Sequence, residues 1–192
     1  AWRPTIVELL CELVPARGLY ERSEGGARNK EGLATRRGVL AGAEPPAEIE
    51  VRGAGVRSSI DVTGGQKTGA YLDQQLNRVR VAAHARGGDV LDAFSYTGGF
   101  ALACLANGAL GAVLVDSSGD ALALAEREAR ANGVHERCRF AVANVFEEMR
   151  ALREAYRKFD VVVLDPPKFV HSAEQISAGS RGYKDINLLG AA

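Results

Sequence analysis

The fold is decided by the stretch DVLDAFSYTGGF, residues 89–100, in which an apolar run leads directly into a pair of glycines. The run over residues 89–94 is typical of a buried strand, and the small residues after it predict a helix over 98–107. Gly98 and Gly99 allow the backbone to approach a ligand closely where this helix begins. A tight turn that binds no ligand remains the alternative for this stretch taken alone.

Downstream of this stretch, short apolar strands and helices continue to alternate. Strands are predicted over residues 112–115, 139–142 and 160–164, and helices over residues 117–131 and 145–156. Ser117 is expected to cap the first of these helices, with Asp120 as its capping-box partner. The alternation predicts an α/β fold with a parallel sheet, right-handed crossovers and helices on both faces. Ligands of such sheets bind beyond the carboxyl ends of the strands, where the strand order switches direction.

The first third of the chain has a different pattern and predicts a small α+β appendage over residues 1–62, followed by the main domain over 63–192. A helix is expected at the start, ended by Pro15, with an apolar stripe that contains Ile6, Val7, Leu9, Leu10, Leu13 and Val14. The remaining expected elements are a strand over 18–22, a glycine-rich loop over 23–37, an antiparallel pair over 48–52 and 56–62, and a helix through Leu76, Val79, Val81 and Ala82 that ends near Arg86.

Composition limits the class of protein. Of the 192 residues 46% are apolar, which suits a packed domain, and the 24 Lys and Arg balance the 24 Asp and Glu. A zero net charge gives no general electrostatic signature of nucleic-acid binding, although a local basic patch can suffice. No long apolar run or signal-peptide layout is present, so we expect a soluble cytoplasmic protein without membrane contact. The isolated Cys11, Cys104 and Cys138 predict buried thiols and no metal site.

Polar residues follow the predicted strands where a ligand is expected. Asp116 suits the two hydroxyls of a ribose, or alternatively a helix N-terminus that favours negative charge. Asn144 is placed to read an adenine amino group and also to act as a helix N-cap. Asp165 is followed by Pro166 and Pro167, which stiffen the loop into a shelf for a flat base. Because the G-x-G-x-x-G fingerprint is absent, an NAD-dependent dehydrogenase is the least favoured class.

Four motifs in this order resemble one known family. They are Gln66-Lys67-Thr68-Gly69 with Leu72-Asp73-Gln74, then residues 94–100, then Asp165-Pro166-Pro167-Lys168-Phe169, then Arg181-Gly182-Tyr183-Lys184-Asp185-Ile186-Asn187. Over residues 63–189 the chain resembles the bacterial large-subunit rRNA cytosine-5 methyltransferases, which are class I, Rossmann-like enzymes that use S-adenosyl-L-methionine. The resemblance implies 23S ribosomal RNA as the partner and C5 of a cytosine as the methylated atom.

The resemblance also implies roles for individual residues. The cofactor-binding residues would be Phe94, Ser95, Tyr96, Thr97, Gly98, Gly99, Asp116, Ser117, Asn144 and Asp165. Asp165 would also be catalytic, lying beside the methyl group and the target base. The substrate-binding residues would be Pro166, Pro167, Lys168, Phe169, Arg181 and Lys184. The chain departs from the family pattern at Asn144, where Asp is usual, and at Gln75, where Arg is usual.

Other parts that the resemblance implies are expected outside these 192 residues. They are an RNA-binding domain before Ala1, further strands, and the cysteine that attacks C6 of the cytosine, after Ala192. The chain is therefore expected to be an inactive fragment on its own, and a homodimer is left open. Two alternatives stay open: a guanine-N7 rRNA methyltransferase, which needs no cysteine, and a non-catalytic domain that binds S-adenosylmethionine or RNA.

Overall fold

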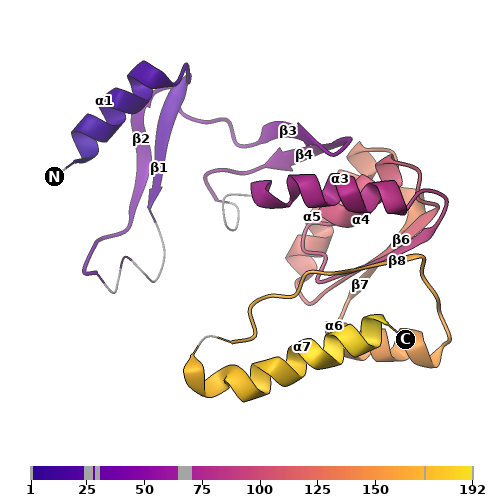
Figure 1. The fold of residues 1–192 in the computed structure, drawn as a ribbon. Coiled ribbons are helices and arrows are strands. Elements are labelled where there is room, and N and C mark those ends of the chain that lie inside the picture. The colour runs from indigo at the N-terminus through magenta and orange to yellow at the C-terminus, as the bar shows by residue number, and fades with distance from the viewer. Residues whose placement is uncertain (1, 24–27, 29–30, 65–70, 171, 192) are drawn as a thin grey trace. The chain divides into compact units, whose positions relative to one another are not determined.

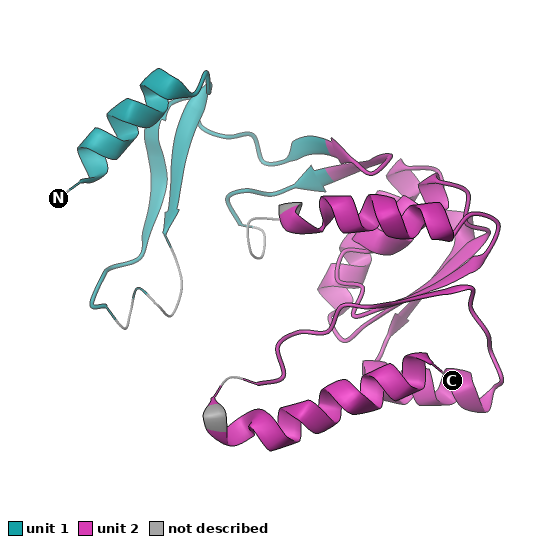
Figure 2. Ribbon diagram, in the orientation of Figure 1, with its two compact units in different colours: residues 1–51, 59–70 teal, residues 52–58, 71–192 magenta. Residues whose placement is uncertain are grey.

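The computed structural model describes residues 2–23, 28, 31–64, 71–170 and 172–191. It forms two compact units, residues 1–51 with 59–70, and residues 52–58 with 71–192 (Figure 2). This division assigns the short segment 52–58 to the larger unit and residues 59–70 to the smaller one. The expected boundary after residue 62 remains a prediction.

The larger unit contains a four-stranded parallel sheet (Figure 1). Its strands are β5 (Asp89–Ala93), β6 (Gly111–Asp116), β7 (Cys138–Val142) and β8 (Val161–Leu164), in the order β7-β6-β5-β8. All three pairings are parallel, which confirms the α/β fold predicted from the alternating pattern. The chain passes outward from β5 through β6 to β7 and then returns to the other side of β5, so strand order switches between β5 and β8.

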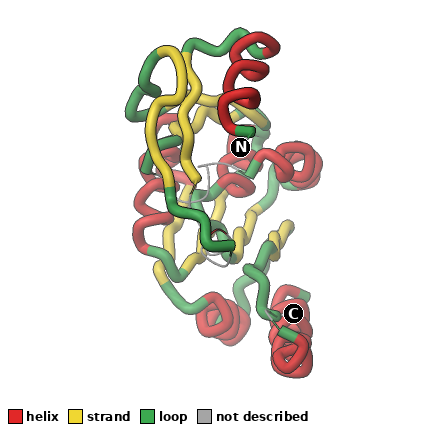
Figure 3. The backbone as a smooth tube through the Cα atoms, turned by 90° about the vertical axis from the view of Figure 1, so that its left-hand side faces the viewer, coloured by secondary structure: helices red, strands yellow, loops and turns green. Residues whose placement is uncertain are grey.

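Helices cover both faces of this sheet, as the turned view in Figure 3 shows. The helices of the larger unit are α3 (Gln75–His84), α4 (Gly99–Ala106), α5 (Gly119–Ala131), α6 (Val145–Glu154) and α7 (Ile176–Gly190). Side chains alternate along the strands, so Leu114 packs into the core beneath α4 and α5, while Val113 and Val115 pack into the core beneath α6. Helix α7 was not predicted, since residues 176–190 contain three glycines that obscure its helical pattern.

The smaller unit differs from expectation in two ways. Helix α1 (Arg3–Leu13) ends before Pro15 as predicted, but none of its residues is buried, and Ile6 and Leu13 are exposed. Strand β1 (Gly18–Ser23) pairs antiparallel with β2 (Arg36–Gly42), part of which had been predicted as loop. The sequence RRGVLAG of β2 lacks the polar–apolar alternation that identifies a strand, so its pairing with β1 decides its conformation.

The hairpin predicted over residues 48–62 is confirmed. Strands β3 (Ile49–Gly53) and β4 (Val56–Ile60) form a two-stranded sheet. The two turn residues, Ala54 and Gly55, have φ angles of 52° and 80°, the positive pair that a tight hairpin turn requires.

The expected cap of α5 is wrong by one residue. Ser118, and not Ser117, accepts a hydrogen bond from the N–H of Ala121, at 3.2 Å. Ser117 is exposed in the loop before it, and Asp120 consequently does not stand at the third helical position that a capping box needs. Two adjacent serines are equivalent in sequence, and the length of β6 selects between them.

No helix of the described chain is long and apolar enough to cross a membrane.

Candidate functional site

The loop after β5 has a strained backbone. Phe94 and Tyr96 have φ angles of 61° and 51°, which residues other than glycine rarely adopt. Between them Ser95 is buried; its N–H donates to the Val115 carbonyl at 3.0 Å, and its carbonyl accepts from the Gly98 N–H at 2.8 Å. Strain of this kind persists only where surrounding contacts enforce it, and it is concentrated at ligand sites. The loop is therefore the first structural indication of a binding site.

The start of α4 is packed tightly on two sides. Gly98 has a φ of 76°, and a Cβ atom on it would lie 2.7 Å from Leu114 Cδ2. On Gly99 a Cβ atom would lie 2.6 Å from Cζ of Arg78, so the guanidinium group of Arg78 rests against this glycine. The groups that lie close to this glycine pair are protein side chains from β6 and α3, and the predicted close approach of a ligand remains a prediction.

Asp92 is a functional candidate that the sequence analysis missed. Its side chain is 1% exposed, and Oδ2 accepts a hydrogen bond from the Ala101 N–H at 2.9 Å. Burial raises the pKa of this carboxyl to about 7; Asp165 and Asp116 add to the shift, while the Ala101 N–H and Arg78 oppose it. Oδ1 has no hydrogen-bond partner among the described residues. An acidic residue inside an apolar strand was the available signal.

Asp116 lies where the sequence analysis placed it, at the carboxyl end of β6 beside the strained loop. Oδ2 accepts from the Tyr96 N–H at 2.8 Å, and Oδ1 accepts from the Ser118 N–H at 2.8 Å. The carboxylate therefore joins the loop after β5 to the start of α5. Each carboxylate oxygen retains a second lone pair, so these bonds leave acceptor capacity for hydroxyl groups of a ligand.

Asn144 also lies at a strand end, directly before α6, and its alternative role as an N-cap is confirmed. Its amide oxygen accepts from the Phe146 N–H at 3.0 Å, and the residue is exposed. The adenine contact predicted for this same oxygen therefore competes with the cap, although the amide also carries two N–H donors. The role of Asn144 toward a ligand remains a prediction.

Asp165 follows β8 directly, and β5 pairs with β8 up to Ala93 and Leu164, so Asp165 and Phe94 emerge from neighbouring strand ends. Gln74 donates from Nε2 to Asp165 Oδ2 at 3.3 Å. The neighbouring Gln75 does not share this contact; its amide packs against Gly53 instead. The motif over residues 66–69 lies outside the described residues.

An aromatic cluster holds the loop that contains Asp165. Phe169 packs against Phe94, Phe146 and Tyr183, with ring centroids 6.2, 5.9 and 4.7 Å apart respectively. The Phe169 N–H also donates to the Tyr183 hydroxyl at 3.2 Å, and Gly182 lets α7 approach the Phe169 ring closely. Phe169 thus has a structural role in fixing the loop to α7, and its predicted contact with substrate stays a prediction.

The remaining predicted substrate residues lie at the surface. Pro167, Lys168, Arg181 and Lys184 are exposed, and Pro166 is half-buried. The Arg181 Nε donates to the Ser177 carbonyl of its own helix at 3.4 Å. These cations lie on the loop after β8 and on α7. Their contact with nucleic acid remains a prediction.

Cys104 and Cys138 are poor nucleophiles in this structure, and the predicted burial of Cys11 is wrong because that residue is exposed. Burial raises the pKa of Cys104 to about 12 and that of Cys138 to about 11, so both thiols stay protonated near neutral pH. Cys104 lies inside α4, Cys138 lies at the amino end of β7, and Cys11 is exposed on α1 of the smaller unit. Among the described residues no group of three or more His, Cys, Asp or Glu could hold a metal ion.

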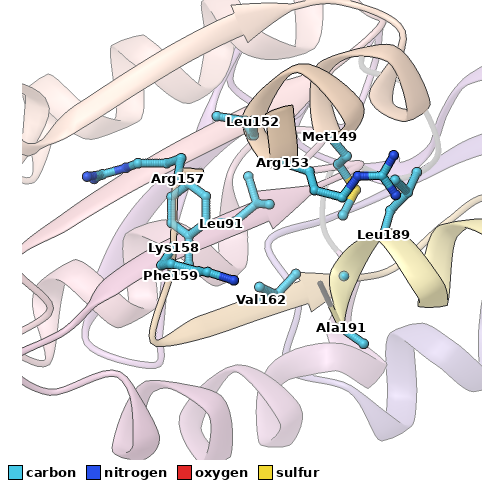
Figure 4. Close-up of a pocket in the computed structure, with 11 residues that line it drawn as sticks. Leu91, Met149, Leu152, Arg153, Arg157, Lys158, Phe159, Val162, Leu189 and Ala191 are labelled. Carbon is cyan, nitrogen blue, oxygen red and sulfur yellow. The ribbon is translucent and has the colours of Figure 1, made fainter. Parts of the chain in front are cut away.

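A separate cavity of about 200 Å³ lies away from the carboxyl ends of the strands (Figure 4). Its apolar wall includes Leu91, Met149, Val162 and Leu189, and three cations also line it, Arg153, Arg157 and Lys158. None of the predicted site residues lines this cavity. The candidate site is therefore the group of residues at the carboxyl ends of β5, β6 and β8.

Gly98→Ala is expected to lower the free energy of unfolding by about 2–4 kcal/mol, because the added methyl group both meets Leu114 and requires a positive φ. Urea denaturation measures the loss. Gly133→Ala is the matched control, since Gly133 has a φ of 68° but no atom within 4 Å of an added Cβ, and a smaller loss of about 1 kcal/mol is expected. Equal losses would refute the contribution of the Leu114 contact.

Asp92→Asn tests the buried carboxyl through pH. Because the folded chain raises the pKa from 3.8 to about 7, folding favours the protonated form, and wild-type stability falls as pH rises through this window. The amide stays neutral, so the stability of Asp92→Asn relative to wild type is expected to rise with pH, by at most about 1.4 kcal/mol per unit. Urea denaturation at several pH values measures this, with Asp120→Asn as an exposed control; a pH-independent difference would contradict it.

Comparisons with known proteins agree with this geometry. A family model described as S-adenosylmethionine-dependent methyltransferase matches residues 37–185. The chain is 44% identical over 190 residues to the ribosomal RNA large subunit methyltransferase I of Aliivibrio fischeri, covering 98% of this chain and 48% of that protein. It thus spans about half the length of that relative.

Two solved structures share the fold. One, from Streptococcus mutans and assigned as a SAM-dependent methyltransferase, has a TM-score of 0.74 at 27% identity, covering 91% of this chain and 45% of that one. The other, assigned as a methyltransferase and complexed with SAH, has a TM-score of 0.80 at 26% identity, covering 98% and 48%. With the family match over most of its length, the chain belongs to the S-adenosylmethionine-dependent methyltransferases.

Proposed function

We propose that the carboxyl ends of β5, β6 and β8 bind S-adenosylmethionine, and that the protein transfers its methyl group to C5 of a cytosine in 23S ribosomal RNA. The observation that carries the proposal is the strained Phe94–Gly99 loop, held by Asp116 beside the point where strand order switches. The relatives named as large-subunit rRNA methyltransferases support the substrate.

The residues present fit the cofactor electrostatically. When bound, S-adenosylmethionine supplies a methyl group on a positively charged sulfur, and the negative charges of Asp165 and Asp116 lie close enough to Asp92 to help raise its pKa. Two buried polar atoms, Asp92 Oδ1 and Ser95 Oγ, lack partners in the described chain and can bond a polar ligand. In this proposal the Phe94–Gly99 loop holds the methionyl part, and Asp116 holds the ribose.

Other residues would contact the adenine and the substrate. Asn144 would contact adenine through its amide group, with Ser117 exposed nearby in the loop after β6. The exposed Asp165 carboxylate, fixed by Gln74 and by the two prolines that follow it, would orient the target base. Lys168, Arg181 and Lys184 offer exposed charges for phosphates.

Chemistry at C5 of cytosine needs a thiolate that attacks C6, and the raised pKa values of Cys104 and Cys138 exclude them from this role. The proposal therefore requires an attacking cysteine other than Cys104 and Cys138. Guanine N7 methylation needs none, so the identity of the methylated atom separates the two specificities.

Asp116→Ala is expected to weaken binding of S-adenosylhomocysteine at least about tenfold, because it removes the charged acceptor for the ribose hydroxyls and releases the Tyr96 N–H. Isothermal titration calorimetry measures the affinity. Asp120→Ala, at an exposed position in the first turn of α5, is the control and should bind as wild type does. Unchanged affinity in Asp116→Ala would remove this residue from the site.

The substrate is tested by incubating a purified protein that carries these 192 residues together with the attacking cysteine, with undermodified large-subunit rRNA and labelled S-adenosylmethionine. Mass spectrometry of the digested RNA should identify 5-methylcytidine at one position. Finding 7-methylguanosine instead would refute the base assignment, and finding no labelled nucleotide would refute the RNA substrate.

A further inference from the structure

The residue directly before α3 does not cap that helix. Gln74 occupies the N-cap position, yet its side chain accepts no hydrogen bond from the first turn of α3. Short side chains such as Ser, Asp and Asn are preferred at an N-cap because their oxygen reaches these N–H groups, and glutamine is not among them. The longer side chain of Gln74 reaches Asp165 instead, 91 residues away in the sequence. Glutamine at this position therefore serves the loop after β8 and not the helix that it precedes.

Asn77 sets the direction of the Gln74 amide. The Nδ2 group of Asn77, in the first turn of α3, donates to Oε1 of Gln74 at 2.8 Å. Since this oxygen faces Asn77, the Nε2 group faces Asp165 and donates to its Oδ2 at 3.3 Å. A reversed amide would place its oxygen against the carboxylate, where neither group has a proton to donate. The two hydrogen bonds thus form a chain from Asn77 through Gln74 to Asp165, and the second bond depends on the first.

The orientation of the Asp165 carboxylate depends on this chain. The two prolines after Asp165 restrict the backbone, and the bond from the Phe169 N–H to the Tyr183 hydroxyl holds the loop to α7. The Asp165 side chain itself is exposed, and Gln74 is its one hydrogen-bond donor among the described residues. An exposed carboxyl group rotates between staggered positions unless a donor holds it. The bond at Oδ2 selects one orientation and leaves Oδ1 as an acceptor.

The charge of Arg78 does not replace this bond. Arg78 and Asp165 lie close enough that the carboxylate raises the pKa of the guanidinium, against the larger effect of burial. A charge without a hydrogen bond attracts both carboxylate oxygens, so it draws the group closer without choosing between its rotamers. The directional contact to Asp165 comes from Gln74.

We propose that Gln74, with its amide oriented by Asn77, is a positioning residue that holds the Asp165 carboxylate in the orientation that aligns the target base. This inference rests on the proposed function, in which Asp165 orients that base. Gln74 and Asn77 act through Asp165 and touch neither the cofactor nor the base. Their loss therefore slows methyl transfer from a bound complex, because a misaligned base reacts more slowly, and leaves cofactor binding intact.

The test is a double-mutant cycle on a purified protein that carries these 192 residues together with the attacking cysteine. The transfer of labelled methyl groups to undermodified large-subunit rRNA gives kcat, and calorimetry with S-adenosylhomocysteine gives the cofactor affinity. Gln74→Met keeps the length of the side chain without the amide, and it should lower kcat about tenfold while changing the affinity less than about twofold. Asn77→Asp removes the donor to Gln74 Oε1, so the Gln74 amide should reverse and kcat should fall about tenfold as well.

The double variant distinguishes a chain of contacts from two separate effects. Because both changes act through the same bond to Asp165, Gln74→Met with Asn77→Asp should be no slower than Gln74→Met alone. Losses in kcat that multiply would overturn the inference, because Asn77 would then act without Gln74. An unchanged kcat in Gln74→Met would overturn it too.

Ala83→Asp adds the same charge as Asn77→Asp at another exposed position of α3, and this control should keep the wild-type kcat and affinity. A loss of S-adenosylhomocysteine affinity in Gln74→Met that matches the loss in kcat would show a purely structural role and overturn the inference. If Gln74→Met does not fold, an unchanged kcat in Asn77→Asp overturns it. A wild-type protein that methylates no RNA would refute the proposed function itself, whereas an active wild type with equally active variants refutes only the role of Gln74 and Asn77.

Discussion

The carboxylate of Asp116 fixes the geometry on which the candidate site depends. It accepts one hydrogen bond from the loop after β5 and one from the start of α5, so one side chain positions two neighbouring strand ends. Charge-assisted bonds to backbone N–H groups are among the stronger hydrogen bonds in proteins. They help to hold Phe94 and Tyr96 in a backbone conformation that neither residue favours.

The charged side chains at the carboxyl ends of the strands lower the stability of the fold and favour the binding of a ligand. Asp92 is buried, and its Oδ1 has no hydrogen-bond partner among the described residues. Arg78 is half-buried, and its buried Nε likewise lacks a partner in the described chain. An apolar pair at these positions would avoid both desolvation costs. Opposite charges left incompletely paired suit a ligand that carries both signs, and S-adenosylmethionine combines a sulfonium and an ammonium group with a carboxylate.

Aromatic packing also supports the loops after β5 and β8. Phe94 from the loop after β5, Phe146 from α6 and Tyr183 from α7 all meet Phe169. Segments that lie far apart in the sequence thus fix the loop that contains Asp165. In this arrangement Phe169 connects the proposed cofactor loop to the helix that carries Arg181 and Lys184.

The sequence by itself determined the order of strands and helices from α3 to β8, because hydrophobic periodicity and glycine positions are local signals. It also placed Asp116, Asn144 and Asp165 at strand ends. It could not show which Ser caps α5 or that β2 is a strand, since these depend on element length and pairing partners. Only the tertiary structure brought Arg78 and Asp92 to the start of α4. The burial of Asp92 and of the Arg78 Nε, and the hydrogen bonds that these atoms lack among the described residues, arise from packing between α3, α4 and β5, which no local pattern encodes.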